Sequence, residues 1–190
     1  MNNIYLIGFM GTGKTSVGEG LAKRMKRKFI DLDDLIELKE RRRICDIFAQ
    51  EGEPYFRRSE HEALKEVARE KDFIVACGGG IVVNRDNIKI MKETGRIICL
   101  RASLPVILKR TRGASHRPLL NVKDQQEQIE CLLKMRAPFY ASADRSIDTS
   151  RLSIDEVISR VSRLTGEKKN KPGRGNRKSA PKRKAKVKKI

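Results

Sequence analysis

The chain has 190 residues, a length that suits one domain with a hydrophobic core of ordinary size. Its formal net charge is +19, but residues 168–190 hold twelve Lys or Arg and no acidic residue, and residues 1–166 carry only +8. A moderately basic body fits an anionic substrate without requiring nucleic acid, and no segment reaches the roughly 18 apolar residues that a membrane helix needs.

Short apolar runs alternate with helical patterns along the chain, which predicts a parallel sheet covered by helices on both faces. The segments expected to form strands are 4–8, 28–33, 73–78, 96–101 and 145–149. Helices are expected at 14–26, 59–71, around 129–136 and 154–164, the last with a capping box formed by Ser153 and Glu156. The predicted fold is therefore a three-layer α/β/α domain with a five-stranded parallel sheet.

Residues 8–16, GFMGTGKTS, lie between the first apolar run and the first helical pattern. Gly8 and Gly13 give them the spacing G-x-x-x-x-G-K-T of a phosphate-binding loop. Glycines allow backbone N–H groups to point at phosphate oxygens, and the helix N-terminus adds its dipole. Lys14 can reach the β- and γ-phosphates, and the Thr15 hydroxyl can bind Mg²⁺. The sequence thus predicts a nucleoside triphosphate site.

The class of phosphate-binding protein follows from what the rest of the chain contains. A GTPase would carry D-x-x-G after a strand, and no aspartate of this chain has a glycine three residues later. The chain is also short for a motor or a helicase. A small kinase fits best, and such an enzyme needs an acceptor site and a lid.

Acidic residues end the second expected strand. Asp31 and Asp33 are two residues apart, so on an extended segment they would point the same way, into the crevice where open α/β sheets bind ligands. One could serve the metal and the other an acceptor hydroxyl. The alternative is an ordinary acidic helix start, which is how we interpret Asp34.

Three further segments are candidates for the acceptor site. Of the adjacent Arg57 and Arg58, only one is expected to face it, and Gly78–Gly80 follow a buried strand, where a ligand could lie against bare backbone or a loose turn could form. Arg136 precedes a proline that we expect to stop its helix. It could offset the helix dipole or provide a guanidinium fork for a carboxylate.

Residues 111–120, TRGASHRPLL, read as a lid that carries Arg117 over the phosphates. We assign no role to His61 or to His116. With only two histidines and no CxxC pair, a zinc site is not expected, and Cys77 and Cys99 lie in apolar runs typical of buried, reduced thiols. The first strand-like run begins within three residues of the start, which leaves no room for a signal peptide, so we expect a cytoplasmic protein.

Together these motifs resemble those of the shikimate kinase family. The family pattern runs G-x-x-G-x-G-K-[ST], D-x-D, F-R-x-x-E, G-G-G, R-P-L-L and R-x-P-x-Y. The corresponding segments here are Gly8–Thr15, Asp31 with Asp33, FRRSE at 56–60, Gly78–Gly80, RPLL at 117–120 and RAPFY at 136–140. The six motifs occur in order, and the resemblance, which includes IDTSRLSIDEV at 147–157, spans residues 3–165.

The resemblance implies an enzyme that moves the γ-phosphoryl group of ATP onto the 3-hydroxyl of shikimate in aromatic amino acid biosynthesis, on a fold of nucleoside-monophosphate-kinase type. It implies catalytic roles for Lys14, Asp33 and Arg117, and Mg²⁺ held by Thr15 and, through water, by Asp31. Shikimate would be bound by Asp33, Arg57, Gly79 and Arg136. The residues that would bind ATP are Gly11, Thr12, Gly13, Lys14, Thr15, Ser16, Arg110, Arg117 and Arg151.

The resemblance divides the chain into a kinase domain, residues 1–166, and a lysine-rich tail, residues 167–190, which we expect to be disordered. The tail is interpreted as a solvated extension; the alternative is an arm for nucleic acid or another polyanion. We expect a monomer. The rival functions are a gluconate or nucleoside-monophosphate kinase, and a nucleic-acid-binding P-loop protein. The last of these would make no use of Asp33, Gly78–Gly80 or Arg136.

Overall fold

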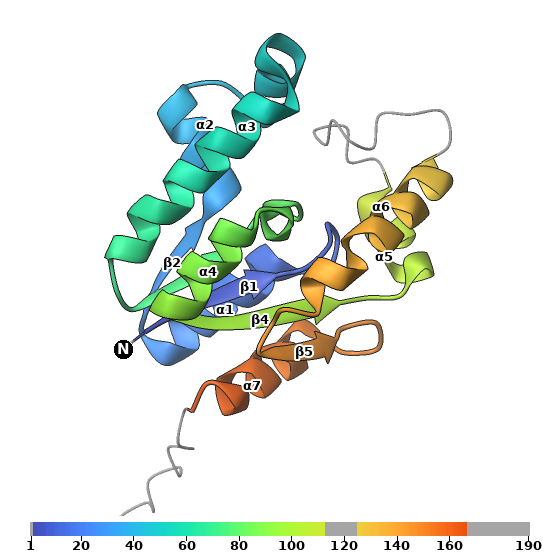
Figure 1. Cartoon of the computed structure of the whole chain (residues 1–190). Helices are drawn as coiled ribbons and strands as arrows, with labels where there is room; N and C mark the ends of the chain where they lie inside the picture. The colour runs from blue at the N-terminus through green and yellow to red at the C-terminus, as the bar shows by residue number, and fades with distance from the viewer. Residues whose placement is uncertain (1, 113–124, 167–190) are drawn as a thin grey trace, which may run out of the picture.

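The computed structural model describes residues 2–112 and 125–166 (Figure 1). Five parallel strands form one sheet in the order β2-β3-β1-β4-β5. The strands are β1(Asn3–Ile7), β2(Lys28–Asp31), β3(Phe73–Ala76), β4(Gly95–Arg101) and β5(Arg145–Asp148). The helices are α1(Lys14–Met25), α2(Leu32–Glu40), α3(Ile44–Arg69), α4(Arg85–Thr94), α5(Leu104–Thr111), α6(Gln125–Tyr140) and α7(Ile154–Leu164), with a 3-10 turn η1(Ile81–Val83). The predicted five-stranded parallel sheet is confirmed.

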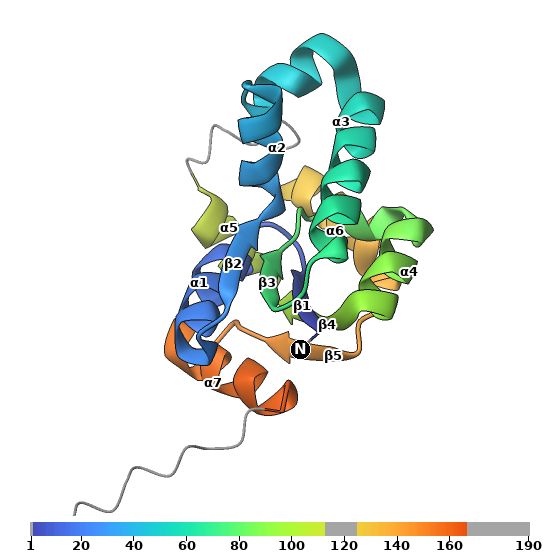
Figure 2. The same ribbon diagram turned by 90° about the vertical axis from the view of Figure 1, so that its left-hand side faces the viewer.

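The alternation of side chains along β1 explains the three layers. Ile4 and Leu6 belong to one buried cluster, with residues of α1 and α7, whereas Tyr5 and Ile7 belong to a second, with residues of α3, α4 and α6. The strand is buried on both faces, as a parallel strand between two helical layers must be. Figure 1 and Figure 2 show α7 beneath the sheet, and α2 and α3 extending beyond it at the opposite end.

Several expected boundaries differ from those observed. The second strand ends at Asp31 rather than at residue 33, because the Asp31 side chain caps α2 by accepting from the Asp33 backbone N–H. The helix expected at 59–71 is the second part of α3, which begins at Ile44 and is interrupted at Gly52. Pro138 lies inside α6 and does not stop it, since the helix continues to Tyr140. These corrections move helix ends and leave the topology unchanged.

Other expectations are confirmed or remain untested. The capping box at the start of α7 has both of its hydrogen bonds, and Cys77 and Cys99 are buried free thiols. Within the described ranges, no helix is long and apolar enough to cross a membrane. Arg117, the RPLL segment and the tail from residue 167 lie outside the described residues, so the predictions made for them stay predictions.

Candidate active site

The phosphate-binding loop connects β1 to α1 at the carboxyl edge of the sheet. Its three glycines all have positive φ, and Gly13 caps α1 in the left-handed conformation at φ 93°. A side chain at Gly8 would collide with the carbonyl oxygen of Leu100 on β4. Lys14 Nζ donates to the carbonyl oxygens of Gly8 and Phe9, at 3.0 and 3.1 Å. These two hydrogen bonds hold the ammonium group over the phosphate-binding loop.

Thr15 and Asp31 meet beside this loop. Thr15 Oγ1 donates to Asp31 Oδ2 at 2.8 Å, and Asp31 Oδ1 accepts from the Asp33 N–H at 3.0 Å. The carboxylate therefore ties the first turn of α1 to the first turn of α2. A hydroxyl and a carboxylate are the oxygen ligands that Mg²⁺ prefers, and the ion usually takes few protein ligands together with substrate phosphates. The pair fits the predicted metal role.

A cavity of about 300 Å³ opens next to Lys14 and Thr15. It contains all four residues predicted to bind the acceptor, although they come from four separate segments: Asp33 from α2, Arg57 from α3, Gly79 from the loop after β3, and Arg136 from α6. Asp31 and Asp34 also line it. The expectation that only one of the two adjacent arginines faces the site is confirmed, because Arg58 stacks over the Tyr55 ring.

Arg57 is held by two carboxylates of its own helix. It donates to Glu60 Oε2 at 2.7 Å and to Glu53 Oε1 at 2.8 Å. Glu60 is 1 % exposed, and this burial raises its pKa above the ordinary value, although Arg57 and Arg136 oppose the shift. Burial acts to lower the pKa of Arg57, but Glu60 and Glu53 outweigh it and raise the pKa. Arg57 is therefore a fixed cation on the cavity wall.

The three glycines after β3 allow charged groups to approach the backbone. A Cβ at Gly78 would lie 2.6 Å from Glu60 Oε1 and 2.8 Å from Asp33 Oδ1, and one at Gly80 would collide with the Arg57 guanidinium. A side chain at Gly78 or Gly80 would displace the residues that line the cavity, whereas a Cβ at Gly79 would have its nearest neighbour at 3.5 Å. The run is thus an ordered part of the site, as the sequence suggested, and the alternative of a loose turn is not supported.

Arg136 reaches the cavity from α6. It is 6 % exposed and its guanidinium lies over the Phe9 ring, 5.9 Å from the centroid. One turn later on α6, the Tyr140 hydroxyl donates to the Gly79 carbonyl oxygen at 2.6 Å. Burial is the main reason that the pKa of this hydroxyl is raised. Arg136 lines the cavity from within α6, a position that is compatible with the second interpretation, a guanidinium for a carboxylate, which stays a prediction.

The residues predicted to bound the nucleotide base lie on the other side of the loop. Arg110 on α5 donates to the Gly11 carbonyl at 3.2 Å and to both oxygens of Thr149 at 3.2 Å. Arg151 is exposed in the turn after β5, two residues from Thr149. The buried Thr12 and the exposed Ser16 complete the predicted set. The structure brings these segments together around the phosphate-binding loop.

Comparisons with known proteins bear on this arrangement. Residues 10–165 match the family model described as shikimate kinase. Shikimate kinase from Thermoanaerobacter pseudethanolicus is 46 % identical over 161 residues, 85 % of this chain and 94 % of that protein; the one from Thermodesulfovibrio yellowstonii is 45 % identical over 161 residues, 85 % and 93 %. A solved structure, shikimate kinase from Acinetobacter baumannii in complex with shikimate, has a TM-score of 0.84 at 36 % identity, covering 86 % and 92 %.

This chain belongs to the shikimate kinase family. Membership makes it an ATP-dependent kinase, and the rival interpretation as a nucleic-acid-binding P-loop protein loses its basis. The match also covers the segments that carry the proposed acceptor residues, from Asp33 to Arg136.

Two residues that contact predicted site residues had no role assigned from the sequence: Glu60, which pairs with Arg57, and Tyr140, which bonds to Gly79. Glu60 is the last residue of the FRRSE motif and follows Arg57 by three residues. At this spacing, two side chains of a helix are neighbours. Tyr140 was visible as the end of RAPFY, four residues after Arg136. In both cases the spacing alone could have indicated a partner on the same helix face.

Proposed function

We propose that this member of the shikimate kinase family transfers the γ-phosphoryl group of ATP to the 3-hydroxyl of shikimate, a step of aromatic amino acid biosynthesis. The observation that supports this acceptor most directly is the composition of the cavity beside Lys14 and Thr15. It combines a carboxylate, Asp33, with two arginines from different helices, Arg57 and Arg136. A polyhydroxylated ring acid needs both kinds of group, an acceptor for its hydroxyls and cations for its carboxylate.

On the acceptor side, Asp33 is proposed to accept a hydrogen bond from the attacking hydroxyl and to take its proton. Arg57 and Arg136 bind the carboxylate and fix the ring, and Gly79 offers its backbone to the ring. Phosphoryl transfer depends mainly on positioning and on charge neutralisation, so a rigid grip remote from the reacting oxygen contributes to the rate. The ion pairs of Arg57 with Glu53 and Glu60 support such rigidity.

On the donor side, backbone N–H groups of residues 11–16 are proposed to bind the phosphates. Lys14 stabilises the charge that develops on the transferred group. We propose Mg²⁺ as the cofactor, with Thr15 and Asp31 as its protein contacts; it would neutralise charge on the β- and γ-phosphates. Arg110 and Arg151 bound the base. The role of Arg117 in the lid rests on the family resemblance.

An ADP-release assay with a panel of acceptors tests the proposed reaction. Shikimate should give a kcat/KM at least about 100-fold above those of gluconate and of nucleoside monophosphates. An acceptor that fits poorly would leave polar groups of the cavity without hydrogen-bond partners. Quinate measures how far another ring acid is tolerated, and the position of the new phosphate is read by phosphorus NMR. Comparable turnover of gluconate, or phosphate on a different hydroxyl, would contradict the proposal.

A pair of aspartate variants tests the assignment of the base. Asp33→Asn should lower kcat by about 100-fold or more while ATP binding stays unchanged, because the amide cannot take the proton. Asp155→Asn is the control, since it makes the same chemical change at an exposed aspartate in the first turn of α7, outside the cavity. Normal turnover by the Asp33 variant would remove its proposed role.

We further propose that the protein acts as a monomer in the cytoplasm, where ATP is available. Residues 167–190 are proposed to be dispensable for catalysis. Their twelve basic residues are a feature that could retain a polyanion through counterion release.

A further inference from the structure

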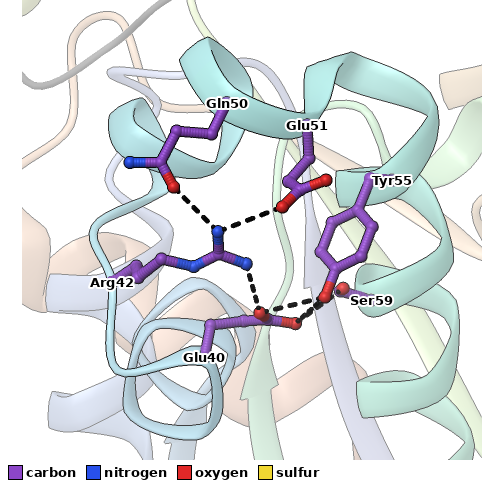
Figure 3. A network of polar contacts seen from close by, with 6 residues as sticks. All are labelled: Glu40, Arg42, Gln50, Glu51, Tyr55 and Ser59. Atoms are coloured by element: carbon purple, nitrogen blue, oxygen red, sulfur yellow. Dashed lines mark hydrogen bonds and ion pairs between the residues drawn. The ribbon is translucent and has the colours of Figure 1, made fainter.

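Glu40, the last residue of α2, accepts hydrogen bonds from two residues of the neighbouring helix (Figure 3). The Tyr55 hydroxyl lies 3.1 Å from both carboxylate oxygens, and Ser59 Oγ donates to Oε1 at 3.0 Å. The carboxylate also receives Arg42 Nη2 at 3.0 Å. Its side chain is only 18 % exposed. The contact therefore joins α2 to α3 through a half-buried carboxylate with several donors, which is a stronger connection than an isolated surface ion pair.

Arg42 extends this network across a break in α3. Its Nη1 donates to Gln50 Oε1 at 2.9 Å and to Glu51 Oε1 at 3.3 Å, both in the first part of the helix. Gly52 then interrupts the helix with φ 78° and ψ 173°, a conformation available almost only to glycine. Tyr55 follows the break. The Glu40 network, defined by the six residues of Figure 3, thus holds both parts of α3 against the end of α2.

Helix geometry connects this network to the cavity. Tyr55 and Ser59 are four residues apart and lie on the same face of α3, the face that meets Glu40. Successive residues of a helix turn by about 100°, so Phe56, Arg57 and Glu60 point to a different side, and these three line the cavity. A rotation of α3 about its axis would carry both faces together. Holding Tyr55 and Ser59 in place therefore also fixes where Arg57 points.

We propose that Glu40 and Tyr55 are positioning residues for substrate binding: their contact sets the axial rotation of α3 and thereby directs Arg57 toward the shikimate carboxylate. This inference rests on the proposed role of Arg57. Neither residue lines the cavity. Their effect on the substrate therefore passes through the orientation of α3.

Tyr55→Phe and Glu40→Gln test the inference with minimal change of shape. Each should raise the KM for shikimate by about three- to tenfold, because each weakens hydrogen bonds that fix the helix face. The KM for ATP and kcat should stay within about twofold, since α1 and the phosphate-binding loop are untouched. The control is Glu62→Gln, which makes the same chemical change on α3 but breaks only an ion pair with Lys65 inside the helix. A lower melting temperature with an unchanged KM for shikimate would mean a merely structural contact and would overturn the proposal.

A double-mutant cycle separates this inference from the role of Arg57. Arg57→Lys keeps the charge but loses the forked geometry, so the KM for shikimate should rise while remaining measurable. Adding Tyr55→Phe to this variant should then raise KM by less than about twofold, because the group to be positioned has gone. If Tyr55→Phe raises the KM for shikimate of the Arg57→Lys variant as much as it raises that of the unchanged protein, Tyr55 does not act through Arg57, and the proposal is wrong. If Arg57→Lys alone leaves KM unchanged, the proposed role of Arg57 fails and the inference fails with it.

Discussion

Arg136 is a charged residue that is buried, and its proposed role depends on that burial. Its guanidinium is almost completely removed from water, packs over Phe9, and is near enough to Glu60 to oppose the rise in the pKa of that carboxyl. A charged group deprived of hydration is stabilised by an anion that enters the same space. The substrate carboxylate is proposed to be that anion, which makes Arg136 more sensitive to replacement than an exposed arginine.

Arg136→Ala should raise the KM for shikimate by about 100-fold or more, since the carboxylate would enter a cavity that has lost one of its two arginines. The KM for ATP should change by no more than about twofold, because no nucleotide contact is removed. Steady-state kinetics with each substrate varied in turn measures both. Arg160→Ala, an exposed arginine of α7 behind the opposite face of the sheet, is the control. Equal increases in the two KM values would argue against the carboxylate role.

The four thiols should divide into two classes. Cys131 is exposed and Cys45 half-buried, whereas Cys77 and Cys99 are buried. Burial raises the pKa of Cys99 to about 11 and the pKa of Cys77 well above its ordinary value. We expect a thiol reagent at pH 8 to label two cysteines of the native protein, with the others more than about 100-fold slower, because thiolate is the reactive form.

The raised pKa of Cys99 makes the stability of the folded protein depend on pH. The folded state keeps the proton of Cys99 more tightly than the unfolded state does, so its contribution to the free energy of unfolding is complete below pH 9 and is lost as the pH rises towards about 11. Denaturation should expose all four thiols to labelling at pH 8. Rapid labelling of four thiols in the native protein would contradict the burial of Cys77 and Cys99.

Among the elements, α3 shows best what its sequence could and could not predict. Its second half follows from apolar spacing, but its start at Ile44 does not, because the GEP segment at 52–54 signals a break. Glu40 contacts the part of α3 after Gly52, and Arg42, bonded to Glu40, contacts the part before it, so the two parts are linked across the break. Such contacts join residues distant in sequence, and no local pattern reports them.

Asp33 lies at the edge of the sheet, as the sequence predicted, but its backbone conformation differs from the predicted one. The sequence placed it on an extended strand, where it would point the same way as Asp31. It lies instead in the first turn of α2, with Asp31 as the cap. Both nevertheless reach the cavity edge, because the helix begins directly at the carboxyl end of β2. The predicted position at the edge of the sheet was sufficient, whereas the backbone conformation depended on the cap.

Gly52→Ala should lower the free energy of unfolding by about 1–3 kcal/mol, because φ 78° with ψ 173° is strained for any residue with a Cβ. The space itself is adequate, since the new Cβ would come no closer than 3.6 Å to Pro54. Gly166→Ala is the matched control, with φ 93° and no atom within 4 Å, but beyond the end of α7. Denaturant unfolding measures the difference. Equal free energies of unfolding for the two variants would contradict the prediction, because they would mean that the backbone at residue 52 accepts a Cβ without strain.

At the scale of the whole molecule, charge and fold divide the chain at the same place. The match to the family model ends at residue 165, and the segment 168–190, with twelve basic and no acidic residues, begins at Lys168. A chain ending at Gly166 should keep kcat, both KM values and the melting temperature of the full chain, since every cavity residue precedes that point. The predicted division into a kinase domain and a dispensable tail is wrong if this truncation impairs catalysis.

The same truncation decides the role of the tail. If residues 167–190 bind polyanions, the full chain should be retained on DNA or RNA with an affinity that falls steeply with salt, and the truncated chain should not. Equal retention of the two chains would leave the tail as a solvated extension. Light scattering on both chains tests the expected monomer.

The order of the strands has a consequence for how acceptor specificity could change. β1 lies at the centre, with the proposed nucleotide contacts at the loop after it and on the β4–β5 side, and most of the acceptor contacts on the β3–β2 side. Most of the residues proposed to bind the acceptor therefore lie in one continuous segment, residues 31–80, next to the site proposed for the phosphoryl donor. Arg136 is the exception, because it crosses to that side from α6. Exchange of residues 31–80 between kinases of this architecture would transfer a new acceptor preference only if α6 were exchanged as well.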